Sequence, residues 1–216
     1  MKENSRFSEL YERCFGFPEV NFYRPWENTW VADALGPPSG LSVLDAGAGK
    51  SPLPLFLAEN GASVITVDHG SRGDKSKQWG FFDYGTVASG IVSHNMDFTK
   101  LSWAKDGQFD TVICLSVIEH IKASMRMDAW REFHRILKSE GSLILTVDLK
   151  EDGFCLWNAC RSVRVEPDFV HGDLSLMLRE LRGIGFVLQR YEQCPWRNER
   201  KIRVVGMVLK KEEDLI

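Results

Sequence analysis

The chain has 216 residues, of which 44% are hydrophobic and 26% are charged, and its formal net charge is −3 at pH 7. That length suits one α/β domain with a full core, and the composition is that of an ordinary globular protein. Because no basic excess creates a positive field, neither nucleic acid nor an anionic membrane surface is an expected partner.

The cysteines are odd in number and widely separated: they are Cys14, Cys114, Cys155, Cys160 and Cys194. This spacing indicates neither a disulfide framework nor a Cys-x-x-Cys zinc site, so we expect no bound metal. It is typical of a reducing compartment, which predicts a cytoplasmic protein. The first residues lack the apolar stretch of a signal peptide, and no apolar run reaches membrane-spanning length, so we expect no membrane span.

Residues 1–40 predict two short helices ahead of the main motif. Apolar residues recur at helical spacing in each, as Trp26 and Trp30 do in the second, and a Gly-Pro-Pro-Ser-Gly loop ends that helix at residues 36–40. We therefore expect an N-terminal helical cap over residues 1–40 and a ligand-binding domain over residues 41–216, which together form a single structural domain.

The central motif is LSVLDAGAGKSPLPLFL at residues 41–57. A short apolar run leads to Asp45, and Gly47 and Gly49 follow at alternate positions. A helical pattern then begins at Ser51 or at the proline after it; a serine suits the N-cap and a proline suits the first turn. The order of strand, glycine turn and helix predicts a position at the carboxyl end of a parallel strand, where open α/β sheets bind ligands.

The spacing of this turn separates three classes of nucleotide-binding protein. A P-loop needs a glycine where the chain has Leu44, and a dinucleotide-binding turn needs one where it has Pro52. The third pattern is an acid two residues before Gly-x-Gly. The segment Asp45-Ala46-Gly47-Ala48-Gly49 fits it, and here the chain resembles the class I S-adenosylmethionine (SAM)-dependent methyltransferases. The resemblance implies that these five residues bind SAM.

Two further acids each follow a predicted strand. The strand at residues 63–67 leads to Asp68, and the strand at residues 91–95 is followed by Asp97. The resemblance implies that Asp68 accepts hydrogen bonds from the ribose hydroxyls of SAM and that Asp97 accepts one from the adenine amine. A helix cap and a turn are the simpler roles for these two acids. The residues expected to line the adenine pocket are His69, Met96, Asp97 and Phe98.

Residues 109–120, FDTVICLSVIEH, are the second signature. They resemble the fourth strand and the following turn of the small-molecule (type 11) methyltransferases, which commonly carry an apolar strand and then a Glu-His pair. His120 would either take a proton from a hydroxyl acceptor or hold the loop by hydrogen bonding. Glu119 and His120 lack the further ligands that a metal site needs. The resemblance implies that the strand end lies beneath the methionine portion of SAM; its residues are Cys114, Leu115 and Ser116.

The remaining segments complete the predicted fold, a Rossmann-like, doubly wound α/β sheet of seven strands with the last strand antiparallel. Asp148 ends a strand on the ligand side, where we expect it to contact the acceptor or to act as a base. Residues 70–89 and 150–172 show little pattern and are expected to be irregular segments near the ligand. The other predicted elements are helices at residues 124–137 and 174–181, a stop at residues 138–141, and strands at residues 142–147, 186–191 and 202–209.

This combination predicts an enzyme that moves the methyl group of SAM to a small-molecule acceptor by in-line displacement and leaves S-adenosylhomocysteine (SAH). Arg24 is a candidate partner for the cofactor carboxylate, with an exposed surface arginine as the simpler alternative. An NAD(P)-dependent oxidoreductase of the Rossmann type is a second possible function, which the Pro52 mismatch and the Asp97 site disfavour. A non-catalytic SAM-fold partner protein is a third, which the retained cofactor residues disfavour. The sequence predicts neither the acceptor's identity nor the oligomeric state.

Overall fold

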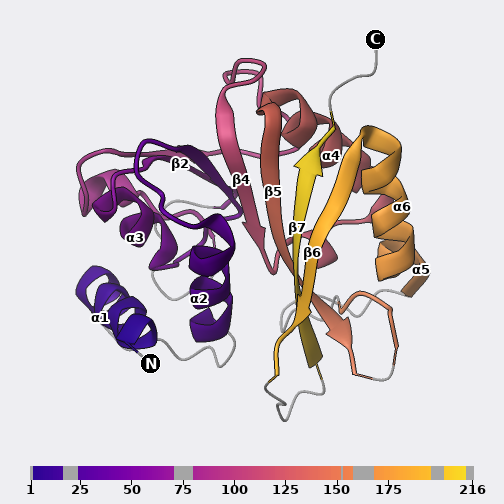
Figure 1. The fold of residues 1–216 in the computed structure, drawn as a ribbon, viewed down its shortest axis with the longest axis horizontal. Coiled ribbons are helices and arrows are strands. Elements are labelled where there is room, and N and C mark those ends of the chain that lie inside the picture. Colours follow the sequence, from indigo (N-terminus) through magenta and orange to yellow (C-terminus); the bar gives the residue numbers. More distant parts are fainter. Residues whose placement is uncertain are drawn as a thin grey trace.

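The computed structural model describes residues 2–16, 24–70, 80–151, 153–157, 168–195 and 202–212. Figure 1 shows the strands in the middle of the molecule, with helices on both sides. The strands are β1 Ser42–Ala46, β2 Ser63–Asp68, β3 Ile91–Asn95, β4 Phe109–Leu115, β5 Leu137–Lys150, β6 Phe186–Gln193 and β7 Ile202–Lys211. The helices are α1 Lys2–Phe15, α2 Arg24–Leu35, α3 Leu53–Glu59, α4 Ala123–Ile136, α5 Asp168–His171 and α6 Leu174–Ile184, and the 3-10 turns are η1 Tyr84–Thr86 and η2 Ile118–His120.

Within the described residues, seven strands form one sheet in the order β3-β2-β1-β4-β5-β7-β6. β1 pairs in parallel with both β2 and β4, and parallel pairing continues outward to β3 and β5. β7 runs antiparallel between β5 and β6. The predicted seven-stranded, doubly wound sheet with an antiparallel last strand is confirmed. Because the strand order reverses between β1 and β4, their carboxyl ends form the switch point at which such sheets bind ligands.

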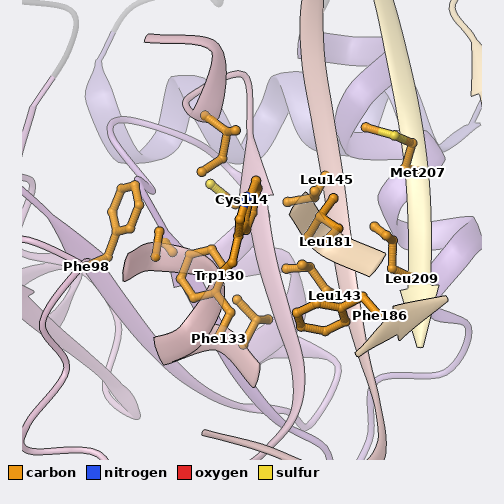
Figure 2. Packing of buried hydrophobic residues seen from close by; sticks show 14 of the residues in the cluster. Phe98, Cys114, Trp130, Phe133, Leu143, Leu145, Leu181, Phe186, Met207 and Leu209 are labelled. Atoms are coloured by element: carbon orange, nitrogen blue, oxygen red, sulfur yellow. The ribbon is translucent and has the colours of Figure 1, made fainter. Parts of the chain in front are cut away.

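Helices cover both faces of the sheet because the central strands are apolar on both sides. In β5, Leu143 and Leu145 belong to one buried cluster, and Ile144 between them belongs to another. α4 and α6 cover the first face, and Figure 2 shows Trp130 and Phe133 of α4 beside the leucines of β5. α1, α2 and α3 cover the second face. With both faces covered, the strand ends are the part of the sheet that a ligand can reach.

The two predicted N-terminal helices are present as α1 and α2, and both pack on the second cluster. Phe7 and Leu10 of α1 and Trp30 and Val31 of α2 are buried there. The Trp30 ring also lies close to β7, since a Cβ at Gly206 would be 2.8 Å from it. α2 is therefore held directly against the sheet. The division of the chain into residues 1–40 and 41–216 stays a prediction.

The predicted stop at residues 138–141 is wrong. These residues are part of β5, which begins directly after α4 at Leu137. The register between β4 and β5 shifts between Phe109 and Thr111, which is the mark of a bulge. Glu140 takes the left-handed conformation there, with φ of 59°, and its carbonyl accepts a hydrogen bond from the Lys210 amine at 2.6 Å. The turn-like composition of this segment therefore marks a bulge inside a strand.

The predicted N-cap of α3 is also displaced by one residue. Pro52 occupies the N-cap position, and α3 begins at Leu53. The Ser51 hydroxyl still accepts the Leu53 amide hydrogen, at 3.2 Å. Ser51 therefore satisfies one of the unpaired amides at the helix start from one position further out than expected.

Parts of two predicted irregular segments lie outside the described residues, namely residues 71–79 of the first, and residues 152 and 158–167 of the second. In the described part of the second, Leu156 forms a β-bridge with Leu149 of β5. Of the helices in the described ranges, none has both the length and the apolar character needed to cross a membrane.

Candidate active site

The glycine turn follows β1 directly. Gly47 has a φ of 79° and Gly49 a φ of 50°, both in the left-handed region that favours glycine. The Gly47 amide donates to the Val67 carbonyl of β2 at 2.7 Å, which ties the turn to the neighbouring strand. A Cβ at Gly47 would lie 2.6 Å from Cγ2 of Val117, which follows β4. The turn therefore joins the carboxyl ends of three adjacent strands and has no room for a larger side chain at Gly47.

Asp68 ends β2 and faces the glycine turn. Its Oδ2 accepts the Gly49 amide hydrogen at 2.6 Å. Burial raises the pKa of Asp68, while hydrogen bonds from the Gly49 and His69 amides act in the opposite direction. Asp68 thus lies beside the glycine turn, where the sequence predicts the ribose-binding acid. His69 follows it with an exposed side chain.

Asp45 is the last residue but one of β1, between buried Leu44 and Ala46. Only 2% of its surface is exposed, and this desolvation raises the pKa of Asp45 to about 7. The positive charge of Arg24 lowers that pKa, and the negative charge of Asp68 raises it. These charged groups therefore share one weakly hydrated environment beside the glycine turn. Ala46 and Ala48 are both buried there.

Tyr84 of η1 holds the glycine turn from inside the protein. The residue is fully buried, and its hydroxyl accepts the Ser51 amide hydrogen at 2.8 Å. The same hydroxyl donates its hydrogen toward two carbonyl oxygens, that of Gly49 at 3.0 Å and that of Ser51 at 2.9 Å. Because the Gly49 amide in turn holds Asp68, Tyr84 supports the predicted ribose-binding acid through the turn.

Three of the residues predicted to line the adenine pocket, Met96, Asp97 and Phe98, follow β3 and differ in their surroundings. Asp97 is exposed, and its Oδ1 accepts the Thr99 amide hydrogen at 2.8 Å, a contact typical of a turn-forming aspartate. Met96 is partly buried against the core. Phe98 is 7% exposed and stacks on Phe133, with ring centroids 5.6 Å apart. Asp97 therefore remains accessible at a strand end, whereas Phe98 packs inward, and the adenine contacts stay a prediction.

The end of β4 has a strained backbone. Cys114 and Leu115 are buried, and burial raises the pKa of the Cys114 thiol well above its ordinary value, which favours a packing role. Ser116 comes next with a φ of 50°, uncommon for a residue other than glycine. Its amide donates to the Thr146 carbonyl of β5 at 2.9 Å. Strain of this kind persists only where neighbouring contacts hold it, and it is frequent at functional sites.

Three buried carboxyl groups meet beside Ser116. We call them the acidic cluster: Glu27 of α2, Glu119 of η2 and Asp148 of β5, with exposed fractions of 1%, 0% and 9%. The Ser116 hydroxyl lies 2.5 Å from Glu27 Oε1 and 3.3 Å from Asp148 Oδ1. The Thr146 hydroxyl also donates to Glu27 Oε1, at 2.5 Å, and the Asp148 amide donates to Glu119 Oε1 at 3.3 Å. The two hydroxyls therefore connect α2 to the ends of β4 and β5.

Arg24 of α2 brings a positive charge to the acidic cluster. Its Nη1 lies 3.3 Å from Glu27 Oε2 and donates to the Leu115 carbonyl, also at 3.3 Å. The alternative of an exposed surface arginine is wrong, since Arg24 is 9% exposed. Burial raises the pKa of Glu119 well above its ordinary value, and repulsion from Asp148 and Glu27 adds to this. Among the described residues Glu119 Oε2 has no hydrogen-bond partner, which further disfavours the ionised form of Glu119.

His120 ends η2, and its side chain reaches solvent. Its ring meets Trp157 edge to face, with centroids 6.3 Å apart. Desolvation by the surrounding residues, together with the charges of His171 and Arg24, lowers the pKa of His120 to about 4. The imidazole is therefore neutral at pH 7 and is a weak base, and its two predicted roles stay predictions. In the described ranges, no group of three or more His, Cys, Asp or Glu side chains is arranged to hold a metal ion.

Sequence reasoning missed Glu27, Thr146 and the hydroxyl contacts of Tyr84. A signal for Glu27 was present: it precedes Trp30 by three residues and Val31 by four, so it shares the buried face of α2. A charged residue on such a face indicates a buried polar partner. Thr146 carries no such signal because it continues the buried pattern of β5, and Tyr84 lies in a segment without periodicity.

The fold and the strand-end site together define a Rossmann-like α/β protein whose glycine turn and acids suit a nucleoside-containing ligand. Among known families, residues 44–145 match a model described as a methyltransferase domain. These residues therefore carry the methyltransferase domain of that family. The predicted resemblance to the class I SAM-dependent methyltransferases of the small-molecule type is confirmed.

Individual relatives agree with this assignment. A ubiquinone biosynthesis O-methyltransferase from Leptothrix cholodnii is 28% identical over 125 residues, which are 56% of this chain and 52% of the relative. A 1,6-didemethyltoxoflavin-N1-methyltransferase from Burkholderia thailandensis, solved with SAH, superposes with a TM-score of 0.70 at 18% identity, covering 90% of this chain and 80% of that one. A magnesium protoporphyrin IX methyltransferase from Synechocystis, solved with SAM, superposes with a TM-score of 0.64 at 21% identity. That superposition covers 94% of this chain and 90% of the other.

These likenesses differ in what they establish. The chain spans about half to three fifths of the length of the first curated relatives, 52%, 50% and 61%. The two solved structures share the fold with this chain. The match to a methyltransferase domain favours methyl transfer over the NAD(P)-dependent oxidoreductase that the sequence left open.

Proposed function

We propose that this chain transfers the methyl group of SAM to a small-molecule acceptor by in-line displacement and leaves SAH. The observation that carries the proposal is the hydrogen bond between Asp68 and the Gly49 amide, in a chain whose residues 44–145 match a methyltransferase domain. This contact fixes an acid of the second strand against a left-handed glycine turn, in which Gly47 and Gly49 carry no side chain. Both features suit the close approach of a nucleoside.

The residues at the strand ends fit the parts of SAM in order. Asp68 would accept hydrogen bonds from the ribose hydroxyls, and Asp97 would accept one from the adenine amine, with His69, Met96 and Phe98 nearby. Asp45 and the glycine turn, with Leu115 and Ser116, would hold the methionine portion, and the guanidinium of Arg24 is available for its carboxylate. When bound, SAM supplies an electrophilic methyl group on a sulfonium, so the protein's main task is orientation, an effect worth about 7–11 kcal/mol in favourable cases.

A small molecule with a hydroxyl group is the acceptor that we propose, because the curated relatives are named as O-methyltransferases. The net charge of −3 supports an acceptor other than nucleic acid. Asp148 and His120 are the proposed candidates to receive the hydroxyl proton. A cytoplasmic location is also a proposal, supported by Cys14, Cys114, Cys155 and Cys194, none of which is joined in a disulfide.

Calorimetric titration with SAM and with SAH tests the cofactor site. Wild-type protein is compared with Asp68→Asn and with the control Asp110→Asn. Asp110 also accepts a backbone amide hydrogen, that of Ser42 at 2.8 Å, but it lies near the amino end of β4, away from the carboxyl ends that form the site. Loss of a charged hydrogen-bond acceptor predicts about a 10- to 100-fold weaker affinity for Asp68→Asn. For the control we expect no change beyond about twofold.

The same titrations decide between the candidate functions. Failure of folded wild-type protein to bind SAM or SAH would overturn the proposal, and binding of NAD in a parallel titration would then support the oxidoreductase. Equal weakening by the two substitutions would remove Asp68 from the site and leave only a general loss of stability.

A further inference from the structure

The acidic cluster concentrates negative charge in a place with little water. Its three carboxyl groups are at most 9% exposed, and Arg24 forms an ion pair with Glu27 at 3.3 Å. If all three carboxyls were ionised beside one guanidinium, the cluster would hold two uncompensated negative charges, which is costly in a buried site. The titratable groups that interact with Glu119 are Asp148 of β5, Glu27 of α2 and Cys114 of β4. Arg24 of α2 pairs with Glu27, and His120, the next residue along the chain, interacts with Arg24 and His171.

Glu119 is a member of the cluster whose surroundings disfavour a negative charge. Its Oε1 accepts the Asp148 amide hydrogen, whereas its Oε2 is buried and has no hydrogen-bond partner among the described residues. An ionised carboxylate would keep such an oxygen unpaired only at a high cost, and a neutral carboxyl lowers that cost because it carries no charge. A new positive charge near the cluster reverses this balance, because it attracts the ionised form across a medium that screens charges poorly.

The methyl donor and its product differ in that charge. The sulfonium of SAM is positive, whereas the sulfur of SAH is neutral. The methionine portion is assigned to Leu115 and Ser116, and the Ser116 hydroxyl touches both Glu27 and Asp148. The cluster therefore adjoins the place where the charge of the ligand changes during the reaction.

We propose that Glu119 releases its proton to solvent when SAM binds and keeps it when SAH binds, so that the acidic cluster sets the preference between methyl donor and product. This inference rests on the proposed function. Ionisation of Glu119 strengthens attraction for the sulfonium, and the attraction ends once the methyl group has left. Product exchange is thereby favoured.

Calorimetry in two buffers of different ionisation enthalpy measures the number of protons released per ligand bound. The proteins are wild type, Glu119→Gln, and the control Glu132→Gln, whose carboxylate on α4 accepts the Leu101 amide hydrogen at 2.6 Å. For SAM we expect wild type and the control to release up to one proton more than Glu119→Gln. For SAH all three should agree. Comparing proteins with one ligand cancels the titration of the ligand's own amino group.

The pH dependence provides a second measure. When binding releases one proton, the affinity rises tenfold for each unit by which pH increases. The SAM-to-SAH affinity ratio of wild type, divided by that of Glu119→Gln, should therefore rise by up to tenfold per pH unit. Infrared difference spectra compare wild type with Glu119→Gln, because Asp45, with a pKa of about 7, also carries a protonated carboxyl. The carbonyl stretch that is absent from Glu119→Gln should disappear from wild type on addition of SAM and persist with SAH.

The outcomes separate the two proposals. If neither SAM nor SAH binds to folded wild type, the proposed function fails, and this inference fails with it. If both ligands bind with the same proton count in wild type and in Glu119→Gln, and the carbonyl stretch persists with SAM, only the role of Glu119 is overturned.

Discussion

Replacement of Gly47 by alanine tests how closely the glycine turn approaches the segment after β4. The φ of 79° at this position costs an alanine about 1–2 kcal/mol. The new Cβ would also lie 2.6 Å and 2.9 Å from the two methyl carbons of Val117, and such overpacking costs about 1–3 kcal/mol. We therefore expect Gly47→Ala to lower the free energy of unfolding by about 2–5 kcal/mol, measured by urea denaturation with tryptophan fluorescence.

Gly40→Ala is the matched control. Gly40 has a φ of 81°, and a Cβ there would meet nothing within 4 Å, so only the backbone cost of about 1–2 kcal/mol applies. Shortening Val117 to alanine removes both clashing methyl groups and should recover part of the loss. A double-mutant cycle between Gly47 and Val117 should give a coupling of about 1–3 kcal/mol. The reasoning is refuted if Gly47→Ala and Gly40→Ala are equally destabilising, or if the cycle shows no coupling.

Two further predictions concern buried groups of the site. Tyr84→Phe leaves the Ser51 amide without its acceptor and should lower the free energy of unfolding by about 1–3 kcal/mol. The control Tyr191→Phe, at an exposed tyrosine, should change that free energy by less than about 0.5 kcal/mol. Equal losses of the two variants in urea denaturation would argue against the hydroxyl contact. Because the folded-state pKa of Asp45 is raised from 3.8 to about 7, its stabilising contribution is complete below about pH 4 and is lost as pH rises through 7. The wild-type stability relative to Asp45→Asn should then fall by up to about 1.4 kcal/mol per pH unit across that window, and a constant difference between pH 4 and pH 8 would contradict this.

Local sequence predicts the position of Asp68 well because it sits at the boundary of an apolar run. Asp68 follows buried Thr66 and Val67 and closes β2, whereas Asp97 comes after β3, in which only Ile91 is buried. Where local composition and pairing compete, prediction fails. Residues 138–141 have the composition of a turn, but pairing with β4 and β7 draws them into β5 as a bulge.

The surroundings of these acids could not be read from the sequence. The turn contact of Asp97 and the inward packing of Phe98 depend on neighbours that the strand pattern does not specify. Asp45 illustrates the same limit: its place after an apolar run is visible, whereas its raised pKa depends on desolvation and on Arg24 from another helix.

The sequence by itself determined the sheet class, the glycine turn and the likeness to a methyltransferase, because these depend on periodicity and spacing within short segments. Only the tertiary structure decided that Glu27 meets Ser116, from 89 residues away, and Thr146, from 119 residues away. It likewise decided that the Tyr84 hydroxyl holds the turn at Gly49 and Ser51. Such contacts arise when helices pack on a sheet, and their cost or benefit is set by burial, which no local pattern encodes.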